Sequence, residues 1–135
     1  MTKFLLLTKY NSAPEDMEPM TNWDPDDITA HLDFLQAVNK ELIERGELVD
    51  GQALAGPEQA KLVTSDGVGA PVLTDGPFPE YKELLAGYQM VDVESEARAI
   101  EIAAQISAAP GPGGKPIGQA IEVRQVMGPL PGVDL

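Results

Sequence analysis

The single histidine, His31, is the side chain of this sequence best suited to moving a proton near neutral pH. It lies three residues after Ile28 and four before Leu35, so a helix would place it beside an apolar stripe. There it could face a cleft and act as an acid or base with help from a nearby carboxylate. A histidine packed at the edge of the core would show the same pattern, and a lone histidine by itself favours that structural role.

Asp75 is the carboxylate that could work with His31. It opens the string Asp75-Gly76-Pro77-Phe78, which is typical of a turn whose carboxylate accepts hydrogen bonds from following backbone amides. We interpret Asp75 first as a turn residue. The same turn, held rigid by Pro77, could also aim Asp75 at His31 or at a substrate. The pair would then carry out acid/base chemistry on a small organic molecule without a cofactor.

Three further side chains are candidates for binding a substrate. Phe78 follows the turn, although packing in the core or at a dimer interface explains it more simply. Tyr88 and Arg124 each lie in an expected strand, where a polar tip could reach a cleft. A buried tyrosine usually just finds a hydrogen-bond partner, and a strand arginine usually pairs with surface acids.

Composition excludes several classes of function. The chain has no cysteine and one histidine, which rules out disulfides, thiolate sites and a multi-histidine metal centre within one chain. Nine Lys and Arg against 22 Asp and Glu give a net charge of -13, which disfavours nucleic acid and anionic membranes as partners. No run approaches the roughly 18 apolar residues of a membrane helix, and no signal-peptide pattern is present, so we expect a cytoplasmic protein.

Periodicity and capping residues predict alternating strands and helices. Asp24 and Pro25 are typical of a helix start, and Arg45-Gly46 of its end, with a buried stripe of Ile28, Leu32, Leu35, Val38 and Leu42 between them. Ser95 caps a second helix over 96–108, with a stripe of Ala99, Ile102, Ala103 and Ile106. Strands are expected at 3–9, 47–54, 60–65, 84–93 and 121–124, the second and third forming a hairpin, and an exposed linker at 109–116.

This order of elements predicts an α+β fold of the ferredoxin-like, split βαβ type, with two helices on one face of an antiparallel sheet. The run Phe4-Leu5-Leu6-Leu7 has no polar alternation, so both faces of the first strand should be dry. Two helices cover only one face, and a second copy is the economical cover for the other. We therefore expect one domain over 1–135, with a loose tail after about 127, and a homodimer with facing sheets.

Thr74 to Glu83 reads TDGPFPEYKE and is followed by Leu84-Leu85-Ala86-Gly87-Tyr88, which resembles the TDGPFAETKE…GGY signature of YCII-related proteins, in their DGPF-motif branch. Leu48-Val49-Asp50-Gly51 and the segment 121–126 (IEVRQV) resemble the family pattern in the same order. The resemblance implies a dimeric α+β barrel, often of unassigned function. In some relatives the cleft holds a histidine and an aspartate as an acid/base pair, and many DGPF members are neighbours of extracytoplasmic-function sigma factors.

Two functions from different classes follow. One is a cofactor-independent enzyme of the lyase or isomerase type, in which His31 and Asp75 move a proton on a small molecule. The other is a non-catalytic dimeric module that senses a metabolite or contacts a sigma factor or another protein. An enclosed polar pocket would favour the first, and an exposed apolar patch would favour the second.

Overall fold

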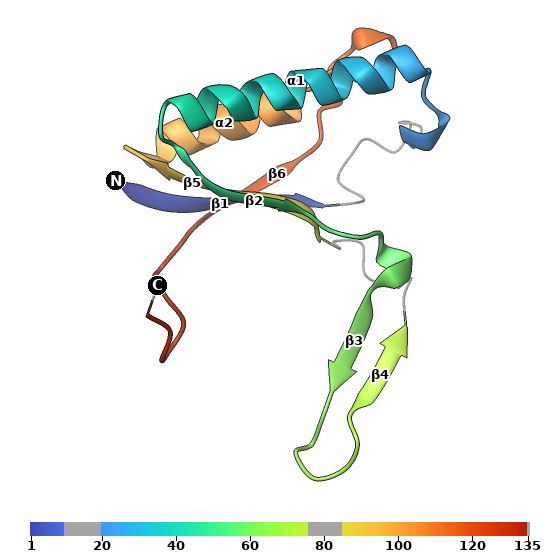
Figure 1. Cartoon of the computed structure of the whole chain (residues 1–135), viewed down its shortest axis with the longest axis vertical. Coiled ribbons are helices and arrows are strands. Elements are labelled where there is room, and N and C mark those ends of the chain that lie inside the picture. Colours follow the sequence, from blue (N-terminus) through green and yellow to red (C-terminus); the bar gives the residue numbers. More distant parts are fainter. Residues whose placement is uncertain (10–19, 76–84, 135) are drawn as a thin grey trace.

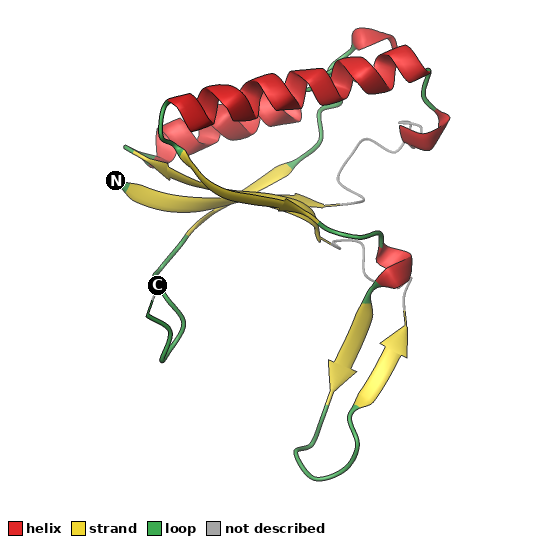
Figure 2. Cartoon of the chain, viewed as in Figure 1, coloured by secondary structure: helices red, strands yellow, loops and turns green. Residues whose placement is uncertain are grey.

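The computed structural model describes residues 1–9, 20–75 and 85–134, and its main sheet confirms the predicted ferredoxin-like α+β fold. The sheet has the strand order β2-β5-β1-β6, and every neighbouring pair is antiparallel. Helices α1 and α2 both lie on one face of this sheet (Figure 1 and Figure 2). The elements are β1 (Thr2–Lys9), α1 (Pro25–Glu44), β2 (Leu48–Ala53), β5 (Leu85–Val93), α2 (Glu96–Ser107) and β6 (Ile121–Gln125).

Both helices begin and end where the capping residues predict. The Asp24 carboxylate accepts a hydrogen bond of 3.0 Å from the Asp26 amide, and Pro25 is the first residue of α1. After α1, Gly46 has a φ of 71°, a conformation that favours glycine and lets the chain turn toward β2. The Ser95 hydroxyl caps α2 by accepting from the Arg98 amide at 3.2 Å. Local sequence therefore fixes the helix boundaries.

The core lies between the two helices and the sheet. Alternate residues of β1, Phe4 and Leu6, point into it, whereas Leu5 and Leu7 are only half-buried. The predicted stripe of α2 is buried throughout, at Ala99, Ile102, Ala103 and Ile106. The predicted stripe of α1 is correct at Val38 and Leu42 but wrong at Leu32, whose side chain is 53% exposed. Leu32 lies instead on an exposed flank of α1, beside Gln36 and Ile43.

The predicted hairpin between the second and third strands is wrong. β2 pairs with β5 inside the main sheet, and a 3-10 helix, Pro57–Gln59, leads the chain away from it. β3 (Lys61–Thr64) pairs instead with β4 (Val72–Asp75), and the two form a separate two-stranded sheet. We call residues 61–75 the arm. Figure 1 shows it extending from the side of the sheet that carries no helix.

The predicted exposed linker after α2 is also partly buried. Ala109, Gly111 and Ile117 are all buried, and Pro110 forms an isolated bridge with Pro116. A side chain at Gly111 would begin 3.0 Å from Ile117 and 3.7 Å from the Trp23 ring. The prolines and glycines do end the helix, as predicted. They form a tight turn that packs near the start of α1 rather than a solvated linker.

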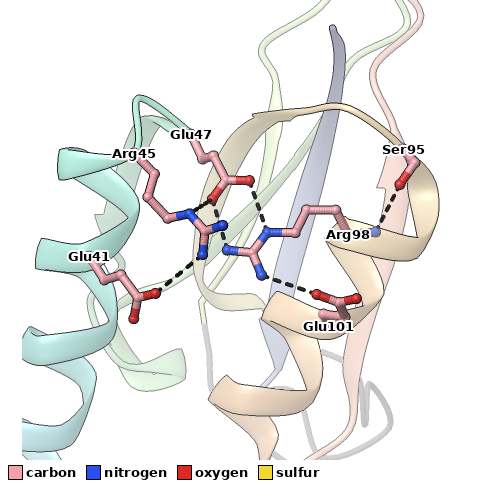
Figure 3. Close-up of polar contacts among 6 residues, drawn as sticks. All are labelled: Glu41, Arg45, Glu47, Ser95, Arg98 and Glu101. Carbon is pink, nitrogen blue, oxygen red and sulfur yellow. Dashed lines mark hydrogen bonds and ion pairs between the residues drawn. The ribbon is translucent and has the colours of Figure 1, made fainter.

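A buried ion pair fixes the start of β2 against the start of α2 (Figure 3). Arg98 donates two hydrogen bonds to the Glu47 carboxylate, at 2.9 and 2.8 Å, and the two side chains are only 12% and 10% exposed. Arg45 and Glu101 extend the network toward solvent, at 3.5 Å from Glu47 and 3.2 Å from Arg98. Hydrogen bonding to Arg98 holds the pKa of Glu47 below its ordinary value. We call these four residues the clamp.

Neither helix of the described chain combines the length and the hydropathy that a membrane-crossing segment needs.

Candidate functional site

A pocket of about 320 Å³ with a mixed polar and apolar lining lies between α1 and the sheet, within the size range of small-molecule sites. Asn39 contributes from α1, and the remaining walls come from three neighbouring strands, β1, β5 and β2. The described lining residues are Thr8, Asn39, Leu48, Gly51, Gln52, Ala53, Gly87, Tyr88 and Gln89. The pocket therefore combines one helix with three paired strands, of which β2 is the exposed edge strand.

Two glycines leave room for this pocket beneath the helix. Gly51 of β2 lies opposite Gln89 of β5, and Gly87 lies opposite Ala53. A Cβ on Gly87 would stand 2.9 Å from the Gln52 carbonyl oxygen, so any side chain there would push the strands apart. A Cβ on Gly51 would make an ordinary contact of 3.4 Å with the Tyr88 carbonyl oxygen. Gly87 is thus required by strand packing, whereas a side chain at Gly51 would fill the pocket.

Asn39 and Gln89 supply the polar groups that face each other across this space. The Gln89 Nε2 group donates to Asn39 Oδ1 at 3.0 Å, joining the C-terminal half of α1 to the central strand β5. Each amide keeps a second polar group, the Asn39 NH2 and the Gln89 carbonyl oxygen, for which the described residues provide no hydrogen bond. Neither atom is a buried group without a partner, so both are open to solvent or a ligand.

Tyr88 is among the residues that border the pocket, but its register partners Leu7 and Gln52 place its side chain on the sheet face that carries no helix, so its role in binding stays a prediction. Its hydroxyl donates a hydrogen bond of 2.7 Å to Asp50 Oδ2, and Gln52 contacts the other oxygen of Asp50 at 3.4 Å. This bond lowers the pKa of the Asp50 carboxyl and raises that of the Tyr88 phenol. Asp50 therefore already has partners, and it fixes the tyrosine side chain along β2.

His31 is buried at the start of α1, in contact with the turn that follows α2. Its Nδ1 lies 3.0 Å from the Pro110 carbonyl oxygen, and its ring meets the edge of Trp23 with centroids 5.5 Å apart. A neutral imidazole that donates from Nδ1 keeps Nε2 as an acceptor. The sequence allowed two interpretations of His31, a packed residue at the core edge and a catalytic acid or base. These contacts agree with the packed residue.

Asp75 lies at the end of the arm, with its side chain 78% exposed and 3.2 Å from Lys61 Nζ. In the described residues no hydrogen bond connects it to His31, which bonds Pro110 instead. Phe78 lies outside the described residues. The pairing of His31 with Asp75 and the role of Phe78 stay predictions.

Arg124 lies on the other side of the sheet from the pocket. Its register partner on β1 is Leu5, one of the residues that alternate away from the helices. The side chain is 71% exposed, and its Nε is 3.5 Å from Glu122 Oε2. The geometry associates Arg124 with the helix-free face rather than with the described pocket.

A second depression, of about 650 Å³, runs along the outer surface of α1. It is lined by Leu32, Leu35, Gln36, Asn39, Lys40, Ile43 and Glu44, all from one helix. A single helix provides no opposite wall, so the smaller pocket, which has walls from four elements, is the better ligand site. Asn39 belongs to both.

Within residues 1–9, 20–75 and 85–134, no group of three or more histidine, cysteine, aspartate or glutamate side chains is arranged to hold a metal ion.

Sequence reasoning missed Asn39 and Gln89. Amide side chains carry no chemical signature of their own, and these two are 50 residues apart in the chain. A usable signal existed in β5, where Gln89 occupies an inward position beside the buried Val91. A polar residue on the helix-facing side of a strand needs a partner, and that partner had to come from α1.

The fold and the pocket together define a class: a ferredoxin-like α+β protein with a ligand-sized pocket between one helix and its sheet. The sequence model of the YCII-related domain matches residues 2–127. The chain therefore belongs to the YCII-related family, as the Asp-Gly-Pro-Phe segment predicted. It is also similar to an uncharacterized protein of Rhizobium meliloti (strain 1021), with 29% identity over 85 residues, which is 63% of this chain and 68% of that protein.

Proposed function

We propose that this protein binds a small organic molecule in the pocket between α1 and the sheet. The observation that carries the proposal is the Asn39–Gln89 amide pair beside Gly51 and Gly87. Backbone hydrogen bonds of a four-stranded sheet hold the strand residues, and a 20-residue helix holds Asn39. Polar groups kept in place on regular elements are what selective binding requires.

Catalysis by His31 and Asp75, of the lyase or isomerase type, is a further step of this proposal. The contact of His31 Nδ1 with the Pro110 carbonyl oxygen supports it, because a neutral imidazole oriented in this way keeps Nε2 as an acceptor. The test compares an NMR pH titration of His31 in the wild-type protein and in Asp75→Asn. A change in the His31 titration would support a functional pair, and identical curves would reject it.

We also propose that the protein is a homodimer whose helix-free sheet faces pack together. Half-buried Leu5, Leu7 and Met90 lie at the centre of that face. Around them the strand register and ion pairs place three cations and three carboxylates, namely Lys3, Lys9, Arg124, Asp50, Asp92 and Glu122. This face is balanced in charge although the chain carries -13, so two copies can meet there without net repulsion.

The dimer is tested by light scattering at micromolar protein, with Leu5→Glu as the disrupting variant. We expect the wild-type protein at twice the chain mass and Leu5→Glu at the chain mass, because burying a carboxylate at the centre of an apolar contact costs more than its pairing with the facing Arg124 returns. A wild-type monomer would reject the proposal. Leu62→Glu, an exposed arm residue, is the matched control.

A non-catalytic binding module is the second candidate function, and the arm favours it. Val63, Val72 and Leu73 are each about 60% exposed there (61%, 61% and 60%). Exposed apolar clusters of this kind mark protein contacts. The resemblance to sigma-factor neighbours makes such a factor the first partner to test, by co-purification with wild-type protein and with Leu73→Ser.

The binding proposal is tested with a ligand-detected NMR screen of small organic fragments against wild-type protein and Gly51→Val. The valine should occupy the pocket at little cost in strand geometry, because its Cβ makes only ordinary contacts. We expect fragments that bind the wild-type protein to lose binding in Gly51→Val and to keep it in Thr64→Val, a matched exposed strand position in the arm. Fragments that bind all three proteins alike would contradict the proposal.

A further inference from the structure

We infer that the ligand of this pocket is a neutral molecule that carries a hydrogen-bond donor and an acceptor on the same carbon, such as a lactam, a primary carboxamide or a urea. The inference rests on the proposed small-molecule function and names its ligand class. It comes from the hydrogen-bonding groups of the pocket wall and from the absence of charge among its described residues.

The donor and acceptor arise directly from the amide pair. Because Gln89 Nε2 donates to Asn39 Oδ1, the Asn39 NH2 is left to donate and the Gln89 carbonyl oxygen is left to accept. Exchanging oxygen and nitrogen in both side chains reverses the internal bond, and the pair then offers a Gln89 donor and an Asn39 acceptor. In either arrangement the pair presents one donor beside one acceptor, which an amide edge complements.

The neutral character follows from the rest of the wall. None of the described lining residues carries a charge at neutral pH. The nearest carboxylate on β2, Asp50, already accepts hydrogen bonds from Tyr88 and Gln52. Against these described residues an ionised ligand would lose water without gaining a counter-charge, which costs far more than transferring an amide to matching hydrogen bonds.

The same geometry predicts which analogues the pocket rejects. A lactone has the ring and the carbonyl of a lactam but no N–H, and an N-methyl lactam replaces that N–H with a methyl group. Either one leaves a polar group of the Asn39–Gln89 pair facing the ligand without a partner. Sites built on hydrogen bonds discriminate against analogues that lack the bonding group, and much more than apolar sites do.

The experiment uses three probes of nearly equal size: pyrrolidinone, N-methylpyrrolidinone and butyrolactone. Each is titrated into the full chain while the side-chain amide signals of Asn39 and Gln89 are followed by proton–nitrogen correlation NMR. We expect pyrrolidinone to shift both signals and to bind about tenfold more tightly than either analogue, the size expected for one or two neutral hydrogen bonds.

Two apolar replacements of similar shape, Asn39→Leu and Gln89→Met, should each reduce pyrrolidinone binding by about fivefold to tenfold and bring the three probes close together. Gln105→Met, on an exposed position of α2, is the matched control and should bind like the wild-type protein.

The outcomes separate the ligand class from the site. Equal binding of lactone and lactam with loss of both in Gly51→Val would overturn the ligand class and leave the proposed function standing. Pyrrolidinone that moves neither amide signal would overturn the ligand class as well. Fragments that bind wild-type protein and Gly51→Val alike would overturn the site itself.

Discussion

We call the main sheet with its two helices the body. The body and the arm contain similar apolar residues, but these are buried in the body and exposed in the arm. In the body, Leu6, Val91 and Ile102 are completely buried between helices and sheet. In the arm, every residue of β3 and β4 is exposed, although half of these positions are Leu or Val. Pairing two strands satisfies backbone hydrogen bonds, whereas burial requires a second layer.

This difference separates two kinds of function. The pocket lies where four elements of the body meet, so strand pairing and the Asn39–Gln89 hydrogen bond hold its glycine and amide groups. The arm offers apolar side chains on both faces and suits association with another surface. Binding a small molecule and contacting a partner can therefore belong to different parts of one chain.

The largest expected effect comes from one substitution made in each region. Leu6→Ala should cost about 3 kcal/mol or more of unfolding free energy, because it leaves a cavity in a fully packed core. Leu73→Ala, at a side chain 60% exposed, should change that free energy by less than about 0.5 kcal/mol at concentrations where the chain is monomeric. Urea unfolding measures both. Similar costs would show that the arm is packed as tightly as the body.

The ion pairs of the two regions give the next contrast. Arg98→Ala removes both short hydrogen bonds from the buried Glu47 carboxylate, leaves it only the longer contact with Arg45, and should cost about 2 kcal/mol. Lys61→Ala removes an exposed pair with Asp75, whose side chains are 59% and 78% exposed, and should cost less than about 1 kcal/mol. Thermal unfolding of the two variants at matched protein concentration checks the ranking. A larger loss for Lys61→Ala would reverse the comparison.

The clamp also predicts a pH dependence. Hydrogen bonding to Arg98 keeps the pKa of Glu47 below its ordinary 4.5 in the folded protein, so the unfolded chain takes up this proton first as pH falls. The stabilising contribution is complete above about pH 4.5 and is lost as pH falls through the lower folded value. Glu47→Gln should flatten stability against pH in this acid range. Glu101→Gln, with a side chain 67% exposed, should change the curve much less.

The smallest expected effect concerns Gly51 in the body. Gly51→Val should alter the unfolding free energy by less than about 1 kcal/mol, because β-branched residues suit strands and the new Cβ makes ordinary contacts. Gly87→Val should cost clearly more, since its Cβ would begin 2.9 Å from a backbone oxygen. Chemical unfolding of the two variants is the measurement. Equal costs would contradict the distinct roles given to the two glycines.

The sequence predicted those parts of the fold that local chemistry determines. Asp24, Pro25, Gly46 and Ser95 mark the helix ends, because caps act on neighbouring backbone groups. The strand that pairs with β2 could not be predicted from local sequence in this way. A Gly56-Pro57 turn suggested pairing with the next strand, while the true partner, β5, begins more than thirty residues later at Leu85.

The candidate site was harder to predict for the same reason. His31 and Asp75 stand out by side-chain chemistry, yet each bonds a different neighbour, Pro110 and Lys61. Asn39 and Gln89 are ordinary residues that matter only because α1 crosses β5 at that point. Tyr88 lies next to Gln89 in β5, but strand alternation turns its hydroxyl toward Asp50 on the other sheet face, so its predicted contact with a ligand stays a prediction.

The central claim is that the body holds a small neutral ligand against the Asn39–Gln89 pair. The most direct test is to measure intermolecular nuclear Overhauser effects between bound pyrrolidinone and the assigned protein protons. The account predicts contacts with the α-protons of Gly51 and Gly87 and with the side-chain amide of Asn39, and none with the methyl groups of Val63 and Leu73 in the arm. Contacts with the arm alone, or with the outer face of α1 at Leu32 and Ile43, would contradict it.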